Sequence, residues 1–74
     1  MWFAITNEAH EVVYGVGTTE RSAWADASEW VENMNGLRAY PCTPGLVAHV
    51  RMAGGAVRAY KLKDGRLGQL AEMD

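Results

Sequence analysis

The chain of 74 residues is long enough for one small domain, with 49% hydrophobic residues and a formal net charge of −2. This composition excludes a disordered segment, and no stretch approaches the roughly 20 apolar residues of a membrane span. The single cysteine, Cys42, excludes an intramolecular disulfide and fits the reducing cytoplasm, where we expect a protein whose N-terminus lacks the features of a signal peptide.

The ionised side chains are divided along the chain. Residues 1–36 contain six acids and one base, residues 37–71 contain six bases and one acid, and two more acids follow. Opposed fields of this kind affect partner choice and encounter rate rather than the fold. We therefore expect an acidic and a basic patch at separate places on the surface.

The first residues predict a β-hairpin. Residues 2–6 and 11–16 are rich in β-favouring side chains, and the polar stretch 7–10 between them can turn the chain. Gly15 and Gly17 near the end of the second strand indicate a bulge or a close approach of another backbone.

A helix is predicted for residues 20–35. Thr19 is a suitable N-cap, and Gly36 supplies a left-handed stop. Its apolar stripe comprises Ala23, Trp24, Ala27, Trp30, Val31 and Met34. We expect both tryptophans of this stripe to lie in the core.

The second half predicts a short strand at residues 37–40, closed by Pro41, and a second helix. Thr43 and Pro44 form a favourable helix start, and Gly54-Gly55 ends that helix.

Two further strands, at residues 56–62 and 66–70, flank the hairpin dipeptide Asp64-Gly65. The order ββαβαββ predicts a single α+β domain, whose mostly antiparallel sheet carries both helices on one face.

Three acids of the predicted first helix form a candidate protein-binding face. Asp26, Glu29 and Glu32 follow one another at three-residue spacing, roughly opposite the tryptophan stripe. They would dock on a basic surface of a partner, such as one that normally holds nucleic acid. The alternative is a solvated helix face that keeps a small protein in solution.

Trp2 is a candidate for apolar anchoring. If Phe3 and Ile5 point inward, strand alternation places Trp2 on the open side of the sheet. Together with Tyr14 or Tyr60 it would form an interface there, because tryptophan and tyrosine are frequent binding hot spots.

A basic hairpin is the candidate nucleic-acid site. Its residues are Arg58, Tyr60, Lys61, Lys63 and Arg66. Bases interleaved with an aromatic ring can follow phosphates and stack on a nucleobase, whereas lysines on an exposed edge also discourage aggregation. A third possibility is a homodimer in which the acidic and basic halves meet across a two-fold axis.

No catalytic or metal-binding signature is present in the sequence. Cys42 precedes the predicted N-cap Thr43, where a helix dipole favours a thiolate, but neither His10 nor His49 has a spacing that ensures contact with it. Paired zinc-ligand spacings and a glycine-rich phosphate loop are absent. We expect an inert, partly buried Cys42, no enzymatic activity, no metal and no cofactor.

Two stretches carry a resemblance to known proteins: YPCTPGLVAHV at 40–50, running on to GGAV at 54–57, and GTTE at 17–20 followed by Ala23-Trp24. They resemble a group of small proteins encoded by bacteriophages and plasmids. The resemblance implies a mobile-element origin. Many small proteins of this origin are anti-CRISPR inhibitors, which bind a CRISPR–Cas effector complex in a bacterial host and block DNA binding or cleavage, and the charge layout of this chain is compatible with that role.

The function favoured by the sequence is therefore a non-enzymatic module that binds a host protein complex. Its expected contact residues are Asp26, Glu29, Glu32, Trp2 and Tyr14.

Overall fold

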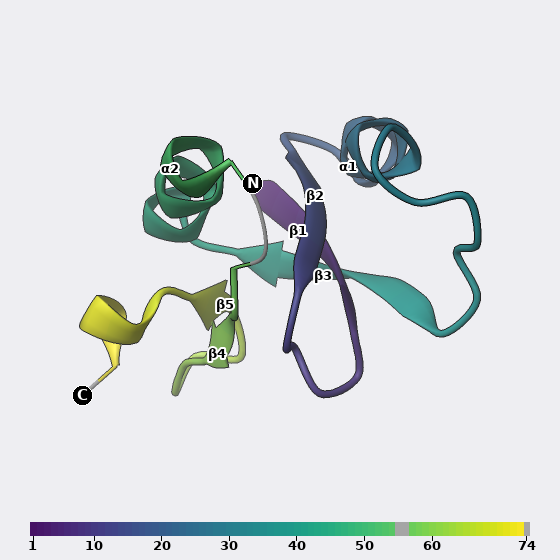
Figure 1. The fold of residues 1–74 in the computed structure, drawn as a ribbon. Coiled ribbons are helices and arrows are strands. Elements are labelled where there is room, and N and C mark those ends of the chain that lie inside the picture. The colour runs from purple at the N-terminus through teal and green to yellow at the C-terminus, as the bar shows by residue number, and fades with distance from the viewer. Residues whose placement is uncertain (55–56, 74) are drawn as a thin grey trace.

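The computed structural model describes residues 1–54 and 57–73, and its fold is drawn in Figure 1. The strands are β1 (Trp2–Asn7), β2 (Val13–Gly17), β3 (Leu37–Cys42), β4 (Tyr60–Lys61) and β5 (Leu67–Gly68). The helices are α1 (Glu20–Ser28) and α2 (Pro44–Ala53), and a 3₁₀ turn (Leu70–Glu72) follows β5. The predicted α+β class and the order ββαβαββ are confirmed.

The five strands form one mixed sheet in the order β2-β1-β3-β5-β4. Among the strands of residues 1–54 and 57–73, only the pair β3–β5 is parallel, and it is short, with Cys42 opposite Leu67. The sheet also curls round on itself. The Val13 N–H donates to the Val57 carbonyl at 2.9 Å, and the Ala59 N–H donates to the His10 carbonyl at 2.9 Å. The chain before β4 therefore pairs with the start of β2 and with the residues just before it.

The two helices contact opposite faces of β1. Ala4 packs in a cluster with Leu46 of α2, whereas the next residue, Ile5, packs with Ala23 and Ala27 of α1. In Figure 1 the helices accordingly flank the β1–β2 hairpin on its two sides. The expectation that both helices cover the same face is therefore wrong. The sheet is curled, with α2 packed against its inner face and α1 against its outer face.

Glycines on β2 allow α1 to lie directly on the strand, as their positions predict. A Cβ atom added to Gly15 would lie 2.6 Å from the Ala23 carbonyl oxygen, and one added to Gly17 would lie 2.6 Å from the Ala23 nitrogen. A bulge is also present, since Ile5 pairs with Gly15 while Thr6 pairs with Val13. The extra residue brings Val13 to the same face as Val16, where both join the α2 cluster.

The first helix is shorter than predicted. It ends at Ser28, with Glu29 as its C-cap, and the predicted continuation to residue 35 is wrong. The Trp30 N–H donates to the Ala27 carbonyl at 3.0 Å, a tighter turn than the α-helical pattern. Beyond it the chain leaves the helix axis, and Met34 and Leu37 pack against the cluster that Ile5 forms with the alanines of α1. Only small residues of α1, Ala23 and Ala27, are buried.

The predicted boundaries in the second half also change. β3 continues through Pro41 to Cys42. Pro41 pairs with Phe3 of β1, and the next residue, Cys42, pairs with Leu67 of β5 on the opposite edge of β3. The hairpin around Asp64-Gly65 is confirmed, although β4 and β5 have two residues each. The predicted stop at Gly55 and strand start at Ala56 fall outside the described residues.

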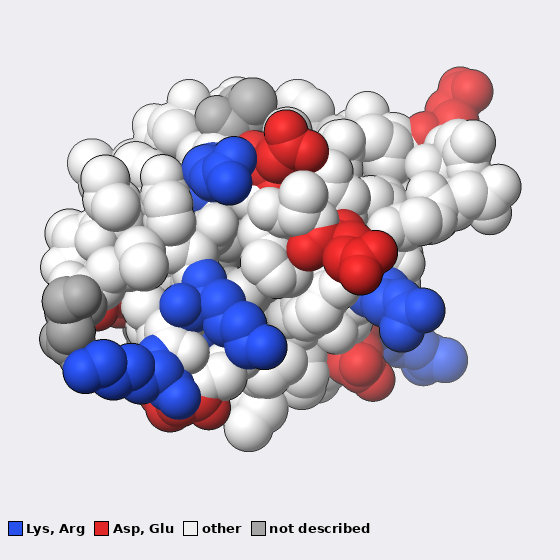
Figure 2. All heavy atoms as spheres, turned by 90° about the horizontal axis from the view of Figure 1, so that it is seen from below, with Lys and Arg blue, Asp and Glu red and all other residues white. Residues whose placement is uncertain are grey.

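Charged groups of both signs share one face of the molecule. Figure 2 shows Lys and Arg on both sides of this face, with Asp and Glu between them. The strand pairing explains the mixing. β3 begins the basic half of the sequence, yet it lies beside β1, so that Arg38 is opposite Thr6 in the acidic half. The expected separation into an acidic and a basic patch is not seen on this face.

Candidate functional site: a groove at the free edge of β2

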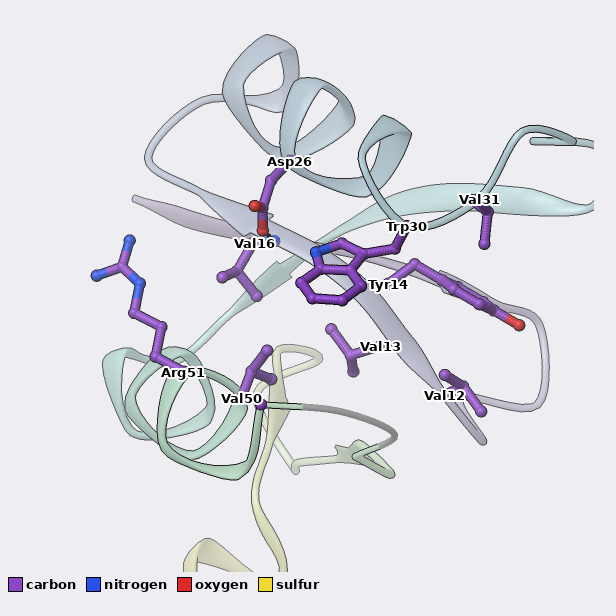
Figure 3. A pocket seen from close by; sticks show the side chains of 10 residues that line it. Val12, Val13, Tyr14, Val16, Asp26, Trp30, Val31, Val50 and Arg51 are labelled. Atoms are coloured by element: carbon purple, nitrogen blue, oxygen red, sulfur yellow. Dashed lines mark hydrogen bonds between the residues drawn. The ribbon is translucent and has the colours of Figure 1, made fainter.

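An open groove of about 430 Å³ lies along β2, between the C-terminal ends of the two helices (Figure 3). β2 is an edge strand of the sheet, and α1 and α2 lie on opposite faces beside it. The lining residues are Val12, Val13, Tyr14, Val16, Asp26, Trp30, Val31, Val50, Arg51 and Gly54.

Trp30 is the most prominent apolar side chain of the groove. It follows the end of α1 and is 68% exposed. In Figure 3 its indole extends over β2, with Tyr14 and Val31 at one end of the groove and Val16 at the other. A tryptophan this exposed beside valines and a tyrosine is the composition of a binding hot spot. The expectation that Trp30 lies in the core is wrong, whereas Trp24 does pack against the α1 cluster.

Asp26 closes part of the strand edge. Its Oδ2 atom accepts a hydrogen bond of 3.0 Å from the backbone N–H of Val16, in the middle of β2. A bare edge N–H invites pairing with another strand, and the carboxylate occupies that donor. Within residues 1–54 and 57–73, Asp26 has no ion-pair partner. The half-buried Asp26 carboxylate thus lies in the groove with no Lys, Arg or His of the described residues within ion-pair distance.

The wall formed by α2 carries the opposite charge. Arg51, in the last turn of α2, holds its guanidinium carbon 5.3 Å from the ring centroid of Trp2. Val50 beside it is half-buried. Figure 3 places Arg51 and Asp26 at the same end of the groove, on its two walls. The groove therefore has one charged end and one apolar end.

The structure separates the predicted protein-binding residues. Glu29 and Glu32 are exposed but lie at and beyond the end of α1, and Asp26 turns toward β2 instead of outward, so the three acids do not form one helix face. Trp2 lies under Arg51 and against the α2 cluster, so it is not on an open side of the sheet. Of the predicted anchors, Tyr14 lines the groove.

The predicted nucleic-acid residues do meet in one hairpin. The Arg58 guanidinium carbon lies 5.7 Å from the centroid of the Tyr60 ring, and Lys61 and Lys63 are exposed. Arg66 is held by Asp64, with 2.7 Å between Nε and Oδ2. The hydrogen bond from the Arg66 backbone N–H, followed by that ion pair, keeps the pKa of Asp64 below its ordinary value.

Cys42 is buried, with 2% of its surface exposed. Burial and, to a smaller extent, the Glu72 carboxylate raise the pKa of its thiol from 9.0 to about 11, whereas Arg66 acts in the opposite direction. This environment suits an unreactive thiol. Within the described part of the chain, no three His, Cys, Asp or Glu side chains are grouped so that they could hold a metal ion.

Comparisons with known proteins found no matching family model, no similar curated protein and no similar solved structure. In the segments that the structure describes, neither helix has the length and apolar character needed to cross a membrane. Function is therefore inferred from the groove and its contacts.

Proposed function

We propose that this protein is a non-enzymatic binding module that holds a protein partner in the groove beside β2. The observation that carries the proposal is Trp30, a large aromatic side chain left 68% exposed over an apolar groove. The contact of an exposed indole with water is unfavourable. A partner that covers the ring removes its apolar surface from water, which contributes favourable free energy to binding. Tyr14 and Val50 supply further apolar contact on either side of β2.

The partner that we propose to test first is a CRISPR–Cas effector complex of a bacterial host, with inhibition of DNA binding or cleavage as the outcome. The support for this choice is the resemblance of residues 17–20, 23–24, 40–50 and 54–57 to small phage and plasmid proteins. Glu29 and Glu32, exposed near Trp30 in sequence, would contact basic residues of the effector.

The experiment uses reconstituted effector complexes and three forms of the protein: wild type, Trp30→Ala and Met52→Ala. Met52 is the matched control, because it is 87% exposed and does not line the groove. Removing a hot-spot tryptophan is expected to weaken binding at least about tenfold, whereas the Met52 variant binds and inhibits like wild type.

Two outcomes would contradict the proposal at different levels. If none of the effectors comigrates with the wild-type protein or is inhibited by it, the assignment of the partner is wrong. If the Trp30 variant binds its partner as tightly as the Met52 variant, the groove is not the binding surface.

A second candidate function, nucleic-acid binding by the β4–β5 hairpin, is favoured by the contact of Arg58 with the Tyr60 ring, next to the exposed Lys61 and Lys63 of the same hairpin. It predicts a complex with DNA or RNA whose affinity falls steeply with salt. Replacement of Arg58 and Lys61 by Gln should abolish a gel shift at low salt. The absence of any shift with the wild-type protein would dispose of this candidate.

A further inference from the structure

We infer that the groove takes an extended segment of the partner as an added strand on β2, and that it selects a basic residue next to an acidic one. The inference rests on the proposed function, because it specifies what the same groove recognises. It follows from the strand edge, from the two charges on the groove walls, and from the alternation of side chains in an extended chain.

The place for an added strand is short and defined. At its start, β2 is already covered, since the Val13 N–H donates to the Val57 carbonyl. The remaining free edge runs from Tyr14 to Gly17, and its last three residues pair with β1 on the other side. At about 3.3 Å per residue, this edge fits about four residues of an extended peptide. Main-chain pairing supplies affinity in such complexes, and side-chain pockets supply specificity.

Asp26 determines which strands can use this edge. While its carboxylate accepts the Val16 N–H, an incoming carbonyl finds that donor occupied. A Lys or Arg of the incoming segment can form an ion pair with the carboxylate, because Asp26 has no ion-pair partner among the described residues. The Val16 N–H is then released to the peptide backbone. A segment without a cation would leave the edge donor blocked and the carboxylate without a counter-charge.

Arg51 specifies the neighbouring residue. Asp26 belongs to the α1 wall and Arg51 to the α2 wall, and the two helices lie on opposite faces of the sheet. Successive side chains of an added strand point to opposite faces. A basic side chain toward Asp26 therefore puts the next side chain toward Arg51, where an acid is complementary. Further along β2, toward Trp30 and Val13, the groove is apolar and fits Val, Ile or Phe.

The test uses a displayed library of random seven-residue peptides, selected in parallel on four forms of the protein: wild type, Asp26→Asn, Arg51→Gln and Trp30→Ala. Asparagine retains an oxygen that can accept a hydrogen bond from the Val16 N–H. This variant therefore removes the charge and keeps the hydrogen bond to the edge of β2. Unfolding curves confirm that each variant folds. The selected peptides are then synthesised, and their affinities for each form are measured.

On wild type we expect enrichment of peptides with Lys or Arg next to Asp or Glu, followed by an apolar residue. These peptides should bind the Asp26→Asn variant at least about tenfold more weakly, the size of effect of a close charge pair at an interface. The Arg51→Gln variant should lose the preference for the acid while keeping that for the base. Bound peptide should also change the amide signal of Val16.

Several results would overturn the inference: no enrichment on wild type, enriched peptides without the basic–acidic pair, or equal binding to wild type and the Asp26→Asn variant. If such peptides still require Trp30, the groove remains a binding surface and only its strand specificity is wrong. If Trp30→Ala selects the same peptides as wild type, the proposed function fails with the inference.

Discussion

Asp26 shows how one side chain can have a role that its place in the sequence hides. Helical spacing puts it with Glu29 on an outward face, yet its carboxylate turns back to the Val16 N–H of the edge strand. The hydrogen bond satisfies a part-buried donor beside the groove. It also makes the edge of β2 less available for pairing with a second copy.

Replacing Asp26 with Ala should therefore destabilise the fold and promote self-association. Loss of the acceptor for a half-buried N–H costs about 1–2 kcal/mol, and the bare edge can pair with another β2. Asp26→Asn should remain within about 0.5 kcal/mol of wild type, because an amide oxygen can replace the carboxylate oxygen. Urea unfolding and sedimentation velocity measure the two effects. A monomeric Ala variant with wild-type stability would show that the bond to Val16 does not protect the edge.

Cys42 gives a pH dependence of known sign. The pKa of its thiol is raised in the folded protein to about 11, so folding favours the protonated form. The associated stability is present in full below pH 9 and is lost as the pH rises toward 11, because the unfolded chain releases its proton first. Urea unfolding of wild type and Cys42→Ala across this range should show a steeper loss for wild type. If the unfolding free energies of the two proteins fell equally with pH, the pKa of the Cys42 thiol would not be raised by folding.

At the scale of elements, the packing of α1 on β2 depends on the absence of a side chain at Gly15. A Cβ there would meet the backbone of Ala23 and Ala27, which cannot move as a flexible side chain would. We expect Gly15→Ala to cost about 3 kcal/mol or more of unfolding free energy. Gly36→Ala is the control, since Gly36 has a φ of 81° but nothing near its added Cβ, and should cost about 1–2 kcal/mol. Equal losses for the two variants in urea unfolding would mean that the close approach is relaxed in solution.

The two helix caps should differ in strength. Thr43 is 3% exposed; its hydroxyl accepts the Leu46 N–H at 3.1 Å and donates to Glu72 at 2.7 Å, which ties the 3₁₀ turn to α2. Thr19 caps α1 in an exposed position. Thr43→Ala should cost about 2 kcal/mol and Thr19→Ala about 1 kcal/mol, as measured by urea unfolding. The reverse order would show that the contact with Glu72 does not stabilise the fold.

Local signals explain which elements could be predicted. The start of α2 at Thr43-Pro44 and the turn at Asp64-Gly65 depend on neighbouring residues alone, and both are found as expected. The end of α1 is harder to predict, because its apolar stripe continues past Ser28. One signal is available: Trp24 and Trp30 are six residues apart, which at 3.6 residues per turn leaves them about 120° from each other. Two large rings so separated cannot both be central in one buried stripe.

The groove itself could not be predicted, because it depends on long-range contacts. Val50 and Val16 meet there only after the sheet curls and α2 packs against its inner face. Tyr14 is expected at an interface from the sequence, but with Trp2 as its neighbour instead of Trp30. The sequence pattern indicates the type of residue that binds a partner, and the fold determines which aromatic is exposed.

At the scale of the whole molecule, the division of charge along the chain does not become a division of the face drawn in Figure 2. The pairing of β3 with β1 brings the two halves side by side, and Figure 2 shows both signs on one face. Recognition is thus better explained by the groove, where shape, an exposed tryptophan and two opposite charges coincide.

Hydrogen exchange of the free protein and of its partner complex tests this claim most directly. Covering the groove should slow amide exchange in β2 and around Trp30, with little change in the β4–β5 hairpin, since backbone groups buried by a partner lose access to solvent. Slower exchange at Arg58, Lys61 and Lys63, with β2 unchanged, would contradict the account and place recognition on the basic hairpin.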